Sequence, residues 1–128
     1  MAFCSRKRSS SIAIMHYWPV IFSVIGMASV SQAAECYAQS GGSFCINYDT
    51  LRSHASDWCR QNYNTLNGNW NTLTDGGGNV ARIGKIGNFE NAQVCTDAYN
   101  NILGCHGHKN GGSWTANGVS LNINFCAW

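Results

Sequence analysis

The segment Gly104–Trp114, GCHGHKNGGSW, concentrates side chains that can bind metals, transfer protons or hold a ligand. Cys105, His106 and His108 are of the types that zinc and copper accept as ligands. A structural zinc site needs further ligands at a matching spacing, and beyond residue 33 the chain offers only one more histidine, His54. Cys105 is also needed to complete an even number of cysteines. The sequence therefore predicts no metal ion and no other cofactor here.

Catalysis would require a histidine and a carboxylate, or two carboxylates, held at a fixed separation. The candidates are His54, His106, His108, Asp75 and Glu90. No two of them stand at a spacing that indicates a catalytic pair, and Glu90 falls in the first turn of an expected helix, where the helix dipole favours an acid. We therefore predict a protein without catalytic residues, with a ribonuclease-like hydrolase as the alternative.

Carbohydrate binding agrees better with these residue types. A sugar presents an apolar C–H face that an aromatic ring can cover, and hydroxyls that polar side chains can bind. Two glycine-rich segments, Asp75–Asn79 and Lys109–Trp114, combine such groups with glycines that let a ligand approach the backbone. The same residues also suit two plain glycine-rich turns beside a core tryptophan. The predicted ligand-binding residues are Trp70, Asp75, Asn79, His106, His108, Lys109, Asn110 and Trp114.

The N-terminal third has the order of a secretory signal peptide. A positive cluster at Arg6–Arg8 precedes a mostly apolar stretch, Ile12–Val30, and small residues follow. We place the cut after Ala33 or Ala34. This predicts a leader, residues 1–33, and one secreted, extracellular domain, residues 34–128, with no membrane span after cleavage.

Loss of the leader changes both the charge and the cysteine count. Three of the eight basic residues leave and all six acids remain, so the net charge falls from +2 to −1. No basic stripe is left for binding nucleic acid, and we predict glycans or glycoproteins as partners. An even number of cysteines in a short secreted chain predicts disulfides, whose pairing stays open. The six are Cys36, Cys45, Cys59, Cys95, Cys105 and Cys126.

Periodicity predicts an α+β fold in which two helices pack on a small antiparallel sheet, in the order α-β-β-α-β-β. The first helix follows Asp49 as its cap. The second covers residues 89–103 after Asn88 and ends at a left-handed Gly104. Residues 34–47 read as irregular apart from their cysteines.

Two hairpins supply the four expected strands. The first joins strands that begin at Trp70 and Val80 through the turn Asp75–Asn79. The second turns at Asn117–Gly118, which is a strong hairpin signal. In the run that follows, residues 119–126, apolar and polar residues alternate, so that the apolar residues lie on one face and Ser120, Asn122 and Asn124 lie on the other.

The chain resembles a family of small secreted fungal glycan-binding lectins, the Y-three-like lectins. The similar pieces are Arg82-Ile83-Gly84, Cys95–Ala98, Asn101-Ile102, Cys105–Gly107, Lys109–Gly112 and Leu121–Cys126. The resemblance implies two helices on a small antiparallel sheet, carbohydrate binding and no catalysis. It transfers no binding residues. Because contacts to single sugars are weak, useful binding would require a homodimer or clustered glycans.

A fainter resemblance is to cysteine-rich fungal killer toxins and effectors, which makes a secreted toxin the other alternative. The chain differs from them in having fewer cysteines and a less basic surface.

Overall fold

The computed structural model describes residues 32–38, 42–65 and 68–127. Most of the expected leader lies outside these residues. The elements follow in the order β1 (Glu35–Tyr37), α1 (Tyr48–Ser53), α2 (Ala55–Asn62), β2 (Trp70–Thr74), β3 (Val80–Ile86), α3 (Ala92–Leu103), β4 (Gly111–Ala116) and β5 (Val119–Asn124). None of the helices described is long and apolar enough to cross a membrane.

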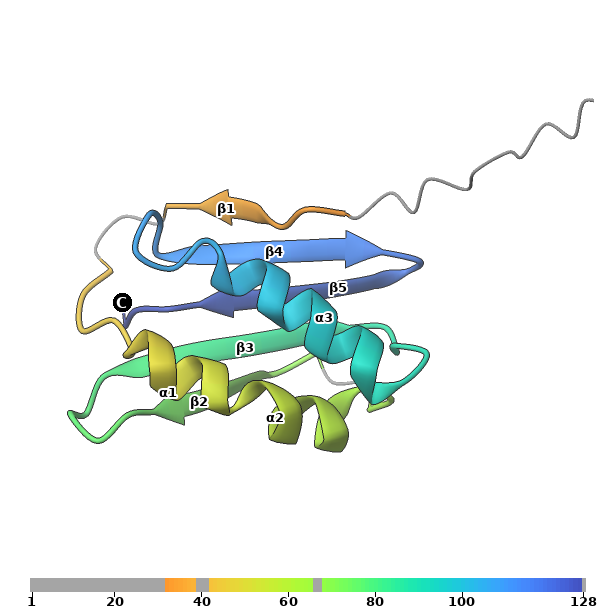
Figure 1. The fold of residues 1–128 in the computed structure, drawn as a ribbon, viewed down its shortest axis with the longest axis horizontal. Helices are drawn as coiled ribbons and strands as arrows, with labels where there is room; N and C mark the ends of the chain where they lie inside the picture. The colour runs from red at the N-terminus through yellow and green to blue at the C-terminus, as the bar shows by residue number, and fades with distance from the viewer. Residues whose placement is uncertain (1–31, 39–41, 66–67, 128) are drawn as a thin grey trace, which may run out of the picture.

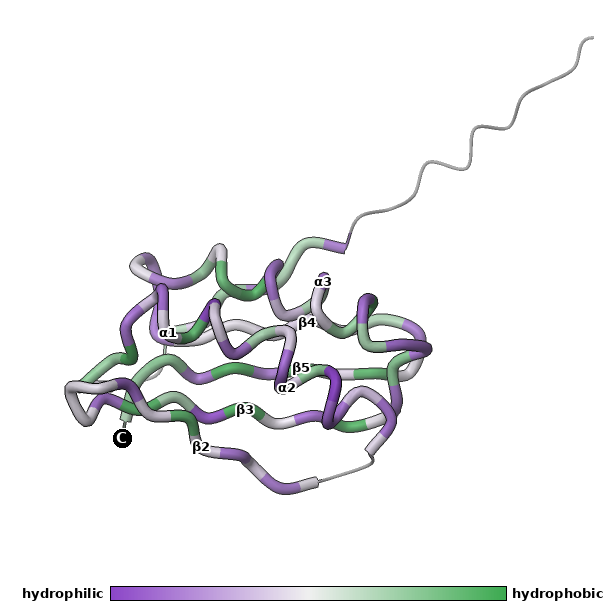
Figure 2. The backbone as a smooth tube through the Cα atoms, turned by 60° about the horizontal axis from the view of Figure 1, so that its bottom comes forward, coloured by the Kyte–Doolittle hydropathy of each residue, from purple (hydrophilic) through white to green (hydrophobic). Residues whose placement is uncertain are grey.

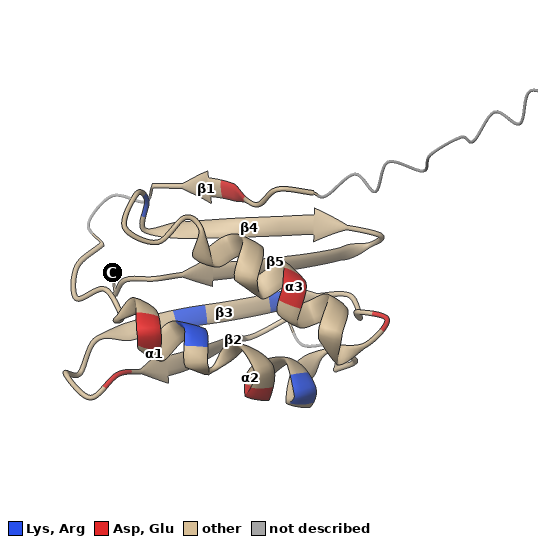
Figure 3. Ribbon diagram, in the orientation of Figure 1, with Lys and Arg blue, Asp and Glu red and all other residues tan. Residues whose placement is uncertain are grey.

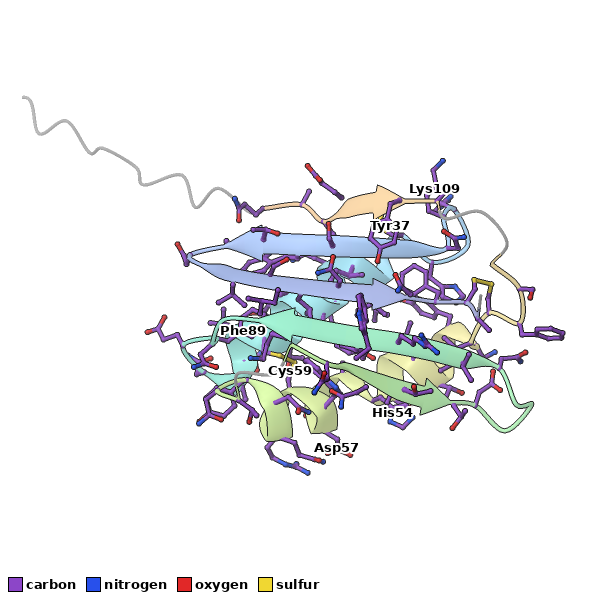
Figure 4. The ribbon with its side chains drawn as sticks, turned by 180° about the vertical axis from the view of Figure 1, so that it is seen from behind. Tyr37, His54, Asp57, Cys59, Phe89 and Lys109 are labelled. Carbon is purple, nitrogen blue, oxygen red and sulfur yellow. A yellow bond between two sulfur atoms is a disulfide. The ribbon has the colours of Figure 1, made fainter. Side chains whose placement is uncertain are left out.

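The strands form one antiparallel sheet in the order β1-β4-β5-β3-β2. All three helices lie on one face of this sheet (Figure 1), and the view from behind shows the other face without a helix over it (Figure 4). We call this second side the open face. The predicted α+β class is confirmed, and the sheet gains a fifth strand because residues 35–37, expected to be irregular, pair with β4.

The core lies between the sheet and the helices. β5 directs Val119, Leu121 and Ile123 inward, as its alternation predicts. Figure 2 shows the matching change of hydrophobic and hydrophilic residues along this strand. The Tyr99 hydroxyl on α3 is fully buried and donates to the carbonyl oxygen of Leu51 on α1 at 2.7 Å. The two helical segments are therefore held together by a hydrogen bond as well as by packing.

Both helix starts differ from the sequence prediction. Asn47, not Asp49, caps α1, since its side-chain oxygen accepts from the backbone N–H groups of Asp49 and Thr50. Asn91, not Asn88, caps α3 through the N–H of Val94. Several Asn and Asp residues precede each helix, and any of them can act as a cap.

The expected first helix is two short helices divided at His54, and Gly104 ends α3 in a right-handed conformation (φ −60°). The left-handed residue after α3 is Gly107, with φ 84°. The hairpin turn at Asn117–Gly118 is confirmed, because both residues have the positive φ that a type I′ turn needs.

The six predicted disulfide cysteines form three bonds. Cys59–Cys95 joins α2 to α3, Cys36–Cys105 ties β1 to the segment after α3, and Cys45–Cys126 links the approach to α1 with the end of the sheet. The first of these lies in the core, the second holds the edge strand β1, and the third lies at the end of the central strand β5. Disulfides of this density are typical of small domains with a modest core.

A buried lysine holds the segment that precedes β2 in place. Lys85 points to the helix-covered side, where its ammonium donates to the carbonyl oxygens of Thr65 and Gly87 and lies 3.5 Å from the side-chain oxygen of Asn88. Burial lowers its pKa from the ordinary 10.5. Lys85 thus ties the segment that leads toward Trp70 to the connection between β3 and α3.

Candidate functional site

The segment that follows α3 is organised mainly by its own backbone. The N–H groups of His108 and Lys109 donate to the carbonyl oxygen of Cys105 at 3.2 and 3.0 Å. The half-buried His106 places its Nε2 2.8 Å from the carbonyl oxygen of Ile46, and its ring packs on Phe125. His106 therefore has a structural role here, while His108 and Lys109 are exposed.

Four of the eight predicted ligand-binding residues meet at this end of the molecule. His106, His108, Lys109 and Asn110 contribute to one cleft of about 410 Å³. Phe125 and the Cys45–Cys126 disulfide line its other side. We call it the end cleft. Within the described part of the chain, no group of three or more His, Cys, Asp or Glu side chains could hold a metal ion.

The turn between β2 and β3 lies at the same end of the sheet (Figure 1). Its two predicted site residues are engaged with each other and with the backbone. The Asp75 carboxylate accepts from the N–H groups of Asn47, Gly77 and Asn79 at 3.0, 2.9 and 3.0 Å, and from the Asn79 side-chain amide at 3.1 Å. Asp75 and Asn79 thus organise the turn and connect it to the start of α1.

These hydrogen bonds should make the stability of the fold depend on pH in the acidic range. The N–H of Asn47 contributes most to lowering the pKa of Asp75 below 3.8, and Asn79 and Gly77 add to it. A lowered folded pKa means that the stabilisation is present above 3.8 and is lost as the pH falls through the folded value. We expect urea denaturation midpoints to fall as the pH is lowered from about 4 to about 2, and to fall less in Asp75→Asn. Glu90→Gln, which removes an exposed acid, should behave as the wild type; equal acid dependence in all three proteins would contradict this role.

The two predicted tryptophan platforms lie on opposite faces of the sheet. Trp114 pairs with Leu121 and shares its helix-covered side, where the half-buried indole packs on Phe89 with ring centroids 5.7 Å apart. Its Nε1 donates to the carbonyl oxygen of Gln32 at 3.2 Å. Trp114 lines other cavities, of about 290 and 330 Å³, and does not line the end cleft.

Trp70 lies on the open face and is 48 % exposed. It pairs with Gly84 of β3, and a Cβ on Gly84 would stand only 3.0 Å from the indole ring. The ring therefore lies across the glycine, with its outer surface free for a ligand. A sugar can stack on such a surface without any rearrangement of the fold.

A second aromatic ring on the open face was missed by the sequence reading. Tyr37 of β1 pairs with Gly111 of β4, and its ring covers that glycine. Its hydroxyl donates to the side-chain oxygen of Asn124 and lies 3.4 Å from the carbonyl oxygen of Ile123. Figure 4 shows Tyr37 on the side of the sheet away from the helices.

Polar side chains fill the open face between the two rings. Cross-strand pairing aligns Ser113 with Asn122, and Asn122 with Gly84. The Asn122 amide nitrogen donates to the Ser120 hydroxyl at 3.3 Å, which leaves its side-chain oxygen as an acceptor. Arg82 is exposed on the same face, and the only ion pair between described residues is elsewhere, between Arg60 and Asp57.

Charged side chains show no concentration that would define another site. Figure 3 shows them dispersed over helices, strands and turns of the described chain. Glu35 at the sheet edge is the one acid among the side chains that β1 to β5 direct to the open face. This face therefore offers hydroxyl, amide and aromatic groups rather than a strong field of either sign.

A comparison of the sequence with models of known protein families agrees with carbohydrate binding. A family model described as alpha-galactosyl binding lectin matches residues 46–127. The site chemistry and this match define a carbohydrate-binding protein. The chain belongs to the alpha-galactosyl binding lectin family. A search of curated proteins gave no match.

Proposed function

We propose that this chain is a secreted, non-catalytic lectin that binds α-galactosyl glycans on the open face. The observation that carries the location is the exposed Trp70 indole, which lies across Gly84 beside a strip of polar side chains. The family match supports the ligand class, and its range contains both residues.

The chemistry of the open face agrees with this ligand. The apolar C–H face of a galactose stacks on Trp70, an arrangement worth about 0.5–1.5 kcal/mol if it resembles other aromatic contacts. Its hydroxyls reach Asn122, Ser113 or Arg82, and each net hydrogen bond adds about 0.5–1.5 kcal/mol. A few such contacts give a dissociation constant on the order of 1 mM. Avidity from a homodimer or from clustered glycans would then supply useful binding.

The composition of the same face supports the proposal that the protein is non-catalytic. Hydrolysis of a glycoside commonly uses two carboxyl groups on either side of the scissile bond. Among the strand residues that point to the open face, Glu35 is the one acid, and it stands on the edge strand beyond Ser113. The strands that form the open face therefore offer no pair of carboxyl groups to a sugar on Trp70.

Secretion is supported by the leader pattern of residues 1–33 and by the three disulfides. Disulfides persist in oxidising compartments and are rare in the cytosol. The new N-terminus would lie just before β1, where Cys36 is already bonded to Cys105. After cleavage of the leader, this disulfide would therefore still hold β1 against the rest of the domain.

The end cleft is the competing location, and one experiment separates the two. We expect Trp70→Ala to weaken binding of methyl α-galactoside about two- to tenfold, equivalent to about 0.5–1.4 kcal/mol. Trp70→Phe should keep part of the affinity. A His108→Ala/Lys109→Ala variant should bind as the wild type. NMR titration measures these weak affinities and confirms folding in the same spectra.

Two results would oppose the proposal. Loss of binding in the end-cleft variant, with Trp70→Ala unaffected, would move the site to the end cleft. If the wild type binds methyl α-glucoside with the same affinity as methyl α-galactoside, the assignment of galactose as the ligand is wrong. Methyl β-galactoside is the matched control for the anomeric configuration.

A further inference from the structure

The open face carries the same construction twice. Trp70 reaches from the edge strand β2 over Gly84 of β3, and Tyr37 reaches from the opposite edge strand β1 over Gly111 of β4. In each case an aromatic ring covers a glycine of the neighbouring strand. Tyr37 lies outside the residues 46–127 that match the family model. The second ring is therefore not part of what the family match supports.

The register fixes how far apart the two rings are. Because both lean inward, β5 is the one strand between the glycines that they cover. Two strand spacings separate Gly84 from Gly111 across the sheet, about 10 Å. Gly84 aligns with Asn122 and Gly111 with Asn124, so the rings are also offset by two residues along the strand, about 7 Å. The gap is larger than one pyranose ring.

We propose that Tyr37 is a second sugar platform and that the open face binds an oligosaccharide that runs diagonally across the strands. This proposal rests on the proposed function, since it takes Trp70 as the place of the terminal α-galactose. The following sugars then pass over Asn122 on β5 and end on Tyr37. A single galactose can contact one platform only.

The Tyr37 side chain has the properties of a platform rather than of a hydrogen-bonding group. Its hydroxyl is already engaged with Asn124 and lies near the Ile123 carbonyl oxygen. Burial raises its pKa to about 12, so the phenol stays neutral over the physiological range. One side of the ring is closed by Gly111, and a ligand can use the half-buried remainder.

The surface between the platforms selects for a ligand rich in hydroxyls. Asn122 and Asn124 of β5 lie between the rings, Ser113 stands next to Asn122 in the register, and Arg82 stands next to Asn124. Homodimer interfaces are typically more apolar than this strip of hydroxyl and amide groups. Neutral oligosaccharides match the mixture of two aromatic rings and a polar floor.

The experiment compares ligands of increasing length. NMR titrations use methyl α-galactoside and α-galactosyl-terminated neutral di- and trisaccharides. In the wild type we expect the best oligosaccharide to bind about tenfold more tightly than the monosaccharide. Tyr37→Ala should lose this gain and keep monosaccharide affinity. Tyr37→Phe, which keeps the ring, should retain the gain.

A change in folding is separated from a change in binding by a second measurement. Side-chain amide signals of Asn122 and Asn124 are followed during each wild-type titration. An oligosaccharide should shift both, while the monosaccharide should shift Asn122 and leave Asn124 nearly unchanged. This readout needs no variant, and it therefore tests the proposal even if Tyr37→Ala folds poorly.

Three results would overturn the second platform. The wild type could show no gain with ligand length, Tyr37→Ala could lose monosaccharide and oligosaccharide binding equally, or the unliganded protein could be a dimer that Tyr37→Ala dissociates. In the last case the face is an interface between copies of the chain. If the wild type binds no galactoside at all, the proposed function itself fails; if it binds the monosaccharide without a length effect, only the Tyr37 platform fails.

Discussion

Replacing Cys59 and Cys95 together by alanine is expected to remove about 4 kcal/mol from the free energy of unfolding. The bond closes a loop with a sequence separation of 36, and the chain-entropy relation gives this value for such a loop, about 4 kcal/mol. Both residues are completely buried, so lost packing adds to the effect. The melting temperature should fall by about 15–30 °C for a domain of this size.

A second disulfide serves as the comparison. Cys45–Cys126 has a sequence separation of 81, and Cys45 is exposed. If chain entropy alone determined the effect, Cys45→Ala/Cys126→Ala would lose slightly more stability than the core pair. We expect it to lose less, because less packing is removed. Intact mass before and after reduction confirms that the remaining bonds have formed, and a melting temperature within about 5 °C of the wild type for the core variant would contradict this role.

Gly87→Ala is expected to be the most damaging of the single glycine substitutions in the connections between strands and helices. Gly87 has φ 82°, and an added Cβ would lie well inside van der Waals contact with the carbonyl oxygen of Gly118. Strain at positive φ costs about 1–3 kcal/mol, and a clash with backbone adds to it because neither segment can rotate away. We expect a total loss of at least about 3 kcal/mol in urea denaturation.

The turn between β2 and β3 provides matched controls for this effect. Gly78 also has a positive φ, 79°, but nothing lies within 4 Å of an added Cβ, so Gly78→Ala isolates the strain. Gly76 has neither feature, and Gly76→Ala should be neutral or slightly stabilising. The expected order of stability is therefore Gly76→Ala, then Gly78→Ala, then Gly87→Ala. A Gly87→Ala variant as stable as Gly78→Ala would show that the contact with Gly118 relaxes without cost.

Local patterns predicted most of the fold because they arise from neighbours in sequence. The alternation that leads to Asn124 and the turn Asn117–Gly118 fix β5 and its hairpin with β4. Cap positions were less accurate, since Asn47 and Asn91 compete with other Asn and Asp residues close by. Three residues are too few to show alternation, and so β1 could not be predicted.

The residues of the proposed binding face were partly predictable for a related reason. Trp70 could be named from its type and from the alternation of its strand. Tyr37 could not, because its position depends on pairing with Gly111, which is distant in sequence and adjacent only through the sheet. Asp75 had the right chemistry for a ligand, but its oxygens bind the turn and Asn47, a contact that only the folded chain creates.

The two glycine-backed rings also restrict how this sequence can change over generations. At Gly111 an added Cβ would collide with the Tyr37 ring, and at Gly84 it would press on the Trp70 ring at 3.0 Å, so a larger residue at either position displaces the ring above it. Conversely, loss of Trp70 or Tyr37 would leave a bare glycine in the sheet, where glycine is a poor strand former. Each ring and its glycine therefore constrain one another, and a substitution at one of the two positions is tolerated best when its distant partner changes as well.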